Sequence, residues 1–362
     1  MTIPSFDALG ETLSAHIELS ESRLETLVML ITGMIGSRTV NLSHVASERG
    51  STAKPASTYR RLQRFFQHVQ AGEDWAARLI ISLLGITGPR TLCLDRTNWK
   101  LGKKDINVLV LAVVTRRHRV PLMWSFLDRA GSSSTVQRIE LMQRYLTIFG
   151  ATSIKRLLGD REFIGAEWMN FLNENNVPFV IRIKKDMGVI LEDGRRFALS
   201  SLLRRTKKTQ RIRAALDLPD KQGQLRLDFA AKKIGKGEWL IVAANKDGHH
   251  ALKAYRQRWS IECLFGDSKT RGLNMEDTGL TIARKLSLLL AIIAIAMAWS
   301  SKTAAIALGT AKPPKKKHGF FAKSWFRTGF DMLRNFLKAG DERAFKPWLR
   351  ISRKSTHNPR VV

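Results

Sequence analysis

The chain has 362 residues, of which 61 are Lys or Arg and 31 are Asp or Glu, so its formal net charge is +30. Hydrophobic residues make up 44% of it, which excludes a charged disordered chain and allows two or three folded domains. This excess of positive charge calls for a polyanionic partner, and we expect nucleic acid. The basic residues are spread along the whole chain, so we expect no membrane partner.

Residues 1–88 are predicted to form a helical DNA-binding domain. Apolar residues recur at three and four spacing in "LETLVMLITGMIGS" and in "TYRRLQRFFQHV", which is typical of amphipathic helices. Two helices separated by Gly50 give 41–68 the layout of a possible helix-turn-helix. The second helix would offer DNA the side chains Tyr59, Arg60, Arg61 and Arg64. An ordinary amphipathic helix with a solvated basic face explains the same pattern, and both interpretations stay open.

Residues 89–182 are predicted to form the first part of an α/β catalytic core. The apolar runs "TLCLD", "INVLVLAVVT" and "VPLMWSFLD" indicate three adjacent strands. A helix over "STVQRIELMQRYLTIFG", a strand over "IKRLLGD", a helix over "GAEWMNFLNENN" and a strand over "VPFVIRI" follow. Three strands, helix, strand, helix, strand is the order of the RNase H-like fold.

The rest of the chain is predicted to hold an insertion, the second part of the core and a C-terminal region. Hairpins around Asp193 and Gly235 indicate a β-rich insertion over 183–245. The second part of the core, 246–300, contains a long helix and the 14-residue apolar run "LSLLLAIIAIAMAW". This run is shorter than the ~20 residues that span a bilayer and is predicted to be a buried core helix. Residues 301–362 are expected to form a basic linker and a helical region.

The cysteine count and the N-terminus both indicate the cytoplasm. Only two cysteines occur, Cys93 and Cys263, which excludes a disulfide framework and a four-cysteine zinc site. We expect both to be buried free thiols. The acidic N-terminus lacks the basic start and apolar centre of a signal peptide. A cytoplasmic protein, associated with the nucleoid when bound to DNA, is the expectation.

Two aspartates are predicted to end neighbouring parallel strands. Asp95 follows "TLCL" and Asp160 follows "IKRLLG". An aspartate after a strand can also simply start a turn. In an RNase H-like sheet, however, the first and fourth strands are parallel neighbours, so the two carboxylates would meet. Adjacent carboxylates repel one another unless a cation joins them, and hard oxygen ligands suit Mg²⁺ or Mn²⁺.

The stretch "YRQRWSIECLFGDSK" places polar side chains on one face of a predicted helix. At 100° per residue, Tyr255, Arg258, Glu262 and Lys269 fall on a stripe about 60° wide. Glu262 would be the third ligand of a two-metal site for phosphodiester chemistry. Arg258 and Lys269 would hold DNA phosphates, and Tyr255 would donate a hydrogen bond or stack. The alternative is a solvent-facing row with an i, i+4 ion pair.

The spacing Y-x2-R-x3-E-x6-K, together with "LCLDRTNW" and "LLGDREFIG", resembles bacterial insertion-sequence transposases of the DDE class that carry the YREK motif. The likeness covers roughly residues 90–290. It implies a homodimeric cut-and-paste enzyme that binds terminal inverted repeats and cleaves and transfers DNA strands with two Mg²⁺ ions. It also implies catalytic, metal-binding roles for Asp95, Asp160 and Glu262.

The same resemblance implies a possible hairpin intermediate and a base-stacking tryptophan in the insertion. Trp239 in "GKGEWLIVAAN" is the matching candidate, although a place in the β core explains it nearly as well. Two other functions remain open. A non-catalytic DNA-binding protein or repressor with this fold would explain the charge, and an RNase H-like nuclease would use the same metals.

Overall fold

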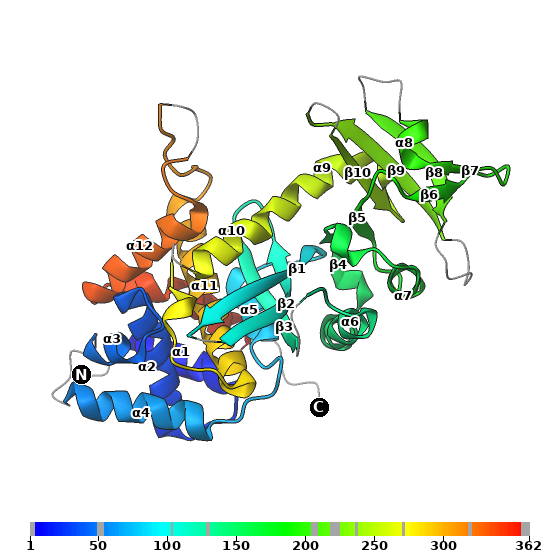
Figure 1. Cartoon of the computed structure of the whole chain (residues 1–362). Helices are drawn as coiled ribbons and strands as arrows, with labels where there is room; N and C mark the ends of the chain where they lie inside the picture. The colour runs from blue at the N-terminus through cyan, green and yellow to red at the C-terminus, as the bar shows by residue number, and fades with distance from the viewer. Residues whose placement is uncertain are drawn as a thin grey trace.

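The computed structural model describes residues 4–48, 54–102, 104–127, 131–203, 209–217, 225–235, 238–269, 272–317 and 321–355. In Figure 1 the N-terminal helices (blue) and the C-terminal helices (orange) lie together at one end of the molecule. The first five strands lie in the middle, and the strands coloured green project at the other end.

The elements described between residues 4 and 84 are all helical, as predicted. They are α1 (Pro4–Ser14), α2 (Glu21–Ser37), α3 (Leu42–Ser47), α4 (Pro55–His68) and α5 (Ala77–Leu84). In α4, Pro55 suits the first turn of a helix, and Leu62, Phe65 and Phe66 form a buried face. α3 and α4 pack against each other, and residues 49–53 between them lie outside the described residues, so the helix-turn-helix over 41–68 stays a prediction.

The middle of the molecule is a sheet with the predicted strand order. Its strands are β1 (Arg90–Leu101), β2 (Lys104–Val114), β3 (Arg119–Leu127), β4 (Ile154–Gly159) and β5 (Phe179–Ile183). They lie in the order β3-β2-β1-β4-β5. β1, β2 and β3 pair antiparallel, whereas β1, β4 and β5 pair parallel. This is the order and direction of an RNase H-like sheet.

The crossover helices are α6 (Thr135–Phe149) and α7 (Ala166–Glu174). α6 begins with a capping box, in which Ser134 and Gln137 bond each other's backbone N–H groups. α6 and α11 both pack against β3, so the central strands are covered and their apolar runs are nearly continuous.

The β-rich insertion continues the central sheet. Its elements are β6 (Gly188–Ile190), β7 (Arg196–Ala198), α8 (Leu199–Leu202), β8 (Gln210–Leu216), β9 (Arg226–Lys233) and β10 (Trp239–Ala244). β10 pairs antiparallel with β5, and Ile241 lies opposite Ile183. The result is one ten-stranded sheet with the order β3-β2-β1-β4-β5-β10-β9-β8-β6-β7 in the described chain.

The remaining helices follow the insertion. They are α9 (Ala251–Tyr255), the 3₁₀ turn η4 (Arg256–Arg258), α10 (Trp259–Ser268), α11 (Ala283–Leu308), α12 (Trp325–Lys338) and α13 (Lys346–Ser355). α11 is the one described helix that is long and apolar enough to cross a membrane, but 83% of its apolar window is buried inside the protein. It is therefore the predicted core helix.

α11 is longer than the apolar run suggested and continues past residue 300, where we expected the core to end. It continues because its residues stay buried as far as Ala304, and α11 packs against α12. A Cβ at Gly329 of α12 would lie 1.9 Å from the carbonyl oxygen of Ser300, so only glycine allows this approach. α11 also packs on α2 and α5, which joins the N-terminal helices to the C-terminal ones.

Candidate active site

Asp95 and Asp160 lie at the point where β1 and β4 part. The parallel pairing of these strands ends at Leu94 and Gly159, so each aspartate is the next residue along the chain. Asp160 follows its strand, as predicted, and caps the short turn η2 (Arg161–Phe163). The prediction that β1 ends at Asp95 is wrong, because β1 continues beyond it by pairing with β2.

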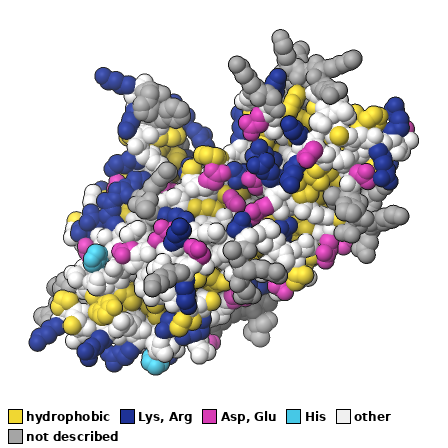
Figure 2. All heavy atoms as spheres, viewed as in Figure 1, with side chains coloured by type: hydrophobic (Ala, Val, Ile, Leu, Met, Phe, Trp, Pro, Cys, Tyr) yellow, Lys and Arg dark blue, Asp and Glu magenta, His cyan; other side chains and the backbone are white. Residues whose placement is uncertain are grey.

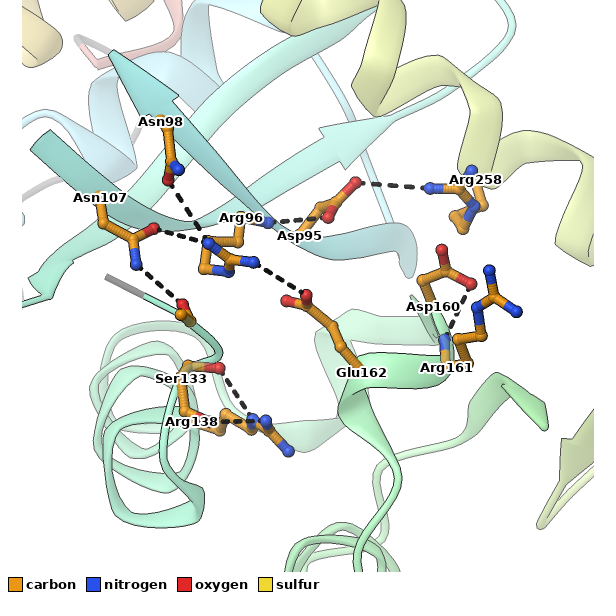
Figure 3. A network of polar contacts seen from close by, with 11 residues as sticks. Asp95, Arg96, Asn98, Asn107, Ser133, Arg138, Asp160, Arg161, Glu162 and Arg258 are labelled. Carbon is orange, nitrogen blue, oxygen red and sulfur yellow. Dashed lines mark hydrogen bonds and ion pairs between the residues drawn. The ribbon is translucent and has the colours of Figure 1, made fainter. Parts of the chain in front are cut away.

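Tyr255, Arg258 and Glu262 turn toward these aspartates from the helical segment α9–η4–α10. The hydroxyl of Tyr255 donates to Oδ1 of Asp160 at 3.2 Å. Nη1 of Arg258 lies 3.4 Å from Oδ2 of Asp95, and its Nη2 pairs with Oε1 of Glu262. The guanidinium of Arg258 therefore lies between two of the predicted catalytic carboxylates, and Figure 3 shows it facing Asp95.

Lys269 lies just beyond the helix that was predicted to contain it. α10 ends at Ser268, and Lys269 has left the helical conformation. Its Nζ donates to the backbone oxygen of Asn98 at 2.7 Å and pairs with Glu276 at 3.4 Å. The side chain of Lys269 thus reaches β1 at Asn98, three residues along the chain from Asp95, and no hydrogen bond or ion pair among the described residues joins it to either aspartate.

The charges of this site act strongly on one another. Burial raises the pKa of Asp95 to about 6; the Arg96 N–H and Arg258 oppose this rise, and repulsion from Glu162 and Asp160 adds to it. Burial acts to lower the pKa of Arg258, but its hydrogen-bonded carboxylate partner and the other acidic neighbours raise it overall. The guanidinium of Arg258 therefore stays charged, whereas the buried carboxyl of Asp95, with acidic neighbours around it, is a weaker acid than usual.

A fourth carboxylate, Glu162, belongs to this site and was missed by sequence reasoning. Its Oε2 pairs with Arg96 at 3.5 Å, and Arg96 also donates to Asn107 at 3.2 Å. Figure 3 shows Glu162 reaching from the turn after β4 toward Arg96 on β1. The pair therefore joins the segment after Asp160 to the segment after Asp95. The sequence feature that could have indicated Glu162 was its position two residues after Asp160 in "GDREF".

The donor set fits a divalent metal ion, although its present arrangement is closed by Arg258. Asp95, Asp160 and Glu262 offer hard oxygen ligands of the kind that Mg²⁺ and Mn²⁺ prefer. In the part of the chain that the structure describes, no three His, Cys, Asp or Glu side chains are grouped closely enough to hold a metal ion. The positive charge between Asp95 and Glu262 comes from Arg258.

Trp239 lies at the first position of β10, half-buried, and pairs with Lys233 of β9. Its neighbour Glu238 lies 3.7 Å from Arg182, and Arg182 in turn lies 3.9 Å from Oδ1 of Asp160. The start of β10 is therefore connected to the site through one arginine, which sequence reasoning did not single out. Trp239 also packs against the hydrophobic core, so both predicted roles remain possible for it.

The four predicted DNA contacts of α4 differ in their surroundings. Arg60 and Arg64 are exposed, and Tyr59 is half-buried against the core. The guanidinium of Arg61 is directed at α2, where it donates to Thr26 at 2.7 Å and pairs with Glu25 at 2.8 Å. Arg61 therefore holds α4 against α2, whereas Arg60 and Arg64 remain open to a ligand.

The sequence and the structure were compared with known protein families, curated proteins and solved structures. The family model described as "Transposase DDE domain" matches residues 86–299. A search of the curated proteins found no match. Among solved structures, the cryo-EM structure of a piggyBac transposase synaptic complex with hairpin DNA is similar, with 10% sequence identity and a TM-score of 0.45 over 99% of this chain and 80% of that chain. Because the family model covers more than half of its length, the chain belongs to the family of proteins with a transposase DDE domain.

Proposed function

We propose that this protein is a cut-and-paste DNA transposase of the YREK-motif group. It would bind the terminal inverted repeats of its own insertion sequence and catalyse metal-dependent cleavage and transfer of DNA strands. The observation that carries the proposal is the convergence of Asp95, Asp160 and Glu262 on Tyr255 and Arg258, which brings together segments 163 residues apart.

The three carboxylates would hold two divalent ions, Mg²⁺ or Mn²⁺. When bound, such ions activate an attacking oxygen and stabilise the leaving oxygen of an in-line displacement. The chain's own contribution is to direct the carboxylates of Asp95, Asp160 and Glu262 at the same pair of side chains, Tyr255 and Arg258, so that they would close around the ions once Arg258 moves away. The like charge around Asp95, which helps to raise its pKa, favours the arrival of a cation there.

Arg258 would exchange partners when DNA binds. Arg258 is only 9% exposed, and its guanidinium is paired with Asp95 and Glu262. A phosphodiester offers the same paired oxygen acceptors as a carboxylate, so it can draw the planar guanidinium away. The exchange would leave the two carboxylates free and keep a positive charge beside the scissile phosphate. Tyr255 would remain as a donor to Asp160 or turn to the DNA.

The other parts of the proposal concern the DNA and the assembly. Arg60, Arg64 and Tyr59 of α4 would contact the terminal repeat, and Trp239 would stack on a base if a hairpin intermediate forms. A homodimer would hold the two element ends together. We place the protein in the cytoplasm, where it would meet the nucleoid.

The direct test uses purified protein, Mg²⁺ and a DNA fragment that carries one end of the element. We expect cleavage at the end and joining of the 3′-end to a target plasmid. Asp160→Asn should bind the fragment with unchanged affinity and cut none of it. Asp186→Asn, which alters an exposed aspartate, is the matched control and should cut normally.

Three results would change the assignment. Normal cleavage by Asp160→Asn would remove the metal-site assignment. Tight end binding with no cleavage in Mg²⁺ or Mn²⁺ would favour the non-catalytic DNA-binding protein. Hydrolysis without joining to target DNA would favour a nuclease.

A further inference from the structure

Residues 309–317 and 321–324, which we call the arm, lie between α11 and α12 in the chain and project from the body of the protein. In Figure 1 the arm is the orange segment that extends away from α12. Its two sides are held together by a β-bridge between Lys315 and Phe321 and by a hydrogen bond from the Ala322 N–H to the Pro314 oxygen at 2.8 Å. Backbone pairing within the arm therefore holds its two sides together.

The arm carries a concentrated positive charge. It contains five lysines and no Asp or Glu. Four of these lysines are exposed and form no ion pair within the described residues: Lys312, Lys315, Lys316 and Lys317. Pro313 and Pro314 stiffen the side of the arm that follows α11, because their rings fix φ. Four like charges held on a stiff projection repel one another, so an external polyanion would stabilise them.

In the view of Figures 1 and 2, the arm and the β-rich insertion project on either side of α9 and α10. Figure 2 shows a hollow between two projections of the surface, and the matching view in Figure 1 identifies them as the arm and the β-rich insertion. α9 and α10, which carry Tyr255 and Glu262, run across the base of this hollow in the same view. Lys and Arg side chains are visible on both projections. A duplex lying in the hollow would meet positive charge on both sides while passing the carboxylates.

We propose that the arm binds the phosphate backbone of duplex DNA next to the active site. This inference rests on the proposed function and adds a DNA-binding surface outside α4 and outside the Tyr, Arg, Glu, Lys pattern. Flexible exposed lysines act as point charges on phosphate, so the contact should not depend on sequence. The duplex is either the element end or the target DNA, which share this backbone chemistry.

The test replaces three charges at the arm and three elsewhere. The arm variant is Lys315→Gln, Lys316→Gln, Lys317→Gln, and all three positions are exposed, so folding should not suffer. The control variant is Lys155→Gln, Lys346→Gln, Arg350→Gln, which removes the same charge from exposed positions on β4 and α13. Circular dichroism and thermal melts would confirm that both variants are folded.

Binding is measured as a function of salt concentration, with a duplex carrying one element end and with a target plasmid offered to pre-cleaved ends. Each lost phosphate contact makes the negative slope of log K against log salt shallower by about 0.9, so the slope of the arm variant should be shallower than that of the wild type by about 2–3. A loss with the end duplex assigns the arm to the element, and a loss only in target capture assigns it to the target.

Equal slopes for the arm variant, the control and the wild type with both DNAs would overturn the inference while leaving the proposed function intact. Loss of the same size in the control would also overturn it, because the effect would then be one of net charge. A wild-type protein that binds neither DNA would overturn the proposed function, and the arm's role with it.

Discussion

Replacing Arg258 by Gln should raise the metal affinity of the DNA-free protein and, at the same time, lower DNA cleavage. The guanidinium of Arg258 pairs with Asp95 and Glu262, so a metal ion must compete with it. In the proposed function, the same guanidinium contacts the phosphate once DNA is bound. The two effects therefore have opposite signs, which a general loss of folding could not produce.

The size of the effect follows from the contacts. Nη1 of Arg258 lies 3.4 Å from Oδ2 of Asp95. At an effective dielectric constant of about 20 this pair has a Coulomb energy of about 5 kcal/mol, which is a ceiling. The side chain of Glu262 is 38% exposed, so its share is strongly screened. Desolvation offsets most of the remainder, and we expect about 1–2 kcal/mol, or about 5- to 30-fold in Kd.

Binding of Mn²⁺, followed by electron paramagnetic resonance without DNA, measures this directly. Arg256→Gln is the matched control, because Arg256 is exposed on the same helical segment and its loss changes net charge equally. Arg258→Gln should bind Mn²⁺ more tightly than both the wild type and the control. Equal Kd values for all three proteins would refute the reasoning that the guanidinium competes with metal.

Three further predictions concern stability and reactivity. Burial lowers the pKa of His118 to about 4, so the neutral imidazole contributes stability above pH ~6.5 that is lost as the pH falls toward 4. The difference in unfolding free energy between wild type and His118→Asn should therefore change by up to about 3 kcal/mol over this range, and a constant difference would contradict the prediction. Gly329→Ala should lower the unfolding free energy by about 1–3 kcal/mol or more, because the new Cβ would lie 1.9 Å from a backbone oxygen. Gly279→Ala is the control, because its Cβ would meet nothing within 4 Å, and equal melting temperatures for the two variants would rule out the predicted clash. Burial raises the pKa of the Cys93 thiol, so a disulfide reagent should titrate only the half-buried Cys263 in the native protein and both thiols in denaturant; two fast native thiols would contradict the described burial.

Local patterns were sufficient for the elements that carry the site. The helical spacing of Tyr255, Arg258 and Glu262 holds through the 3₁₀ turn η4, because that turn interrupts the α-helix only briefly. The strand order was predictable because each crossover helix separates strands that must then pair parallel. Boundaries were less predictable: β1 continues past Asp95 and α11 past residue 300, since partner strands and helices extend both elements.

Long-range partners could not be predicted from the sequence. Nothing near Glu238 in the sequence indicates that β10 would pair with β5 and bring Arg182 between Glu238 and Asp160. Likewise, the basic face of α4 gave no sign that Arg61 would turn to α2. Both outcomes depend on which helix or strand packs alongside.

The order of residues by itself determined that Asp95 and Asp160 would lie on or directly after two parallel strands and Glu262 on a helix, because periodicity and chain direction are local properties. Only the tertiary structure decided that Arg258 would lie between two of these carboxylates and that Glu162 would join them. The physical reason is that electrostatic energy depends on the distance between charges and on their burial, and both are set only when distant segments pack together.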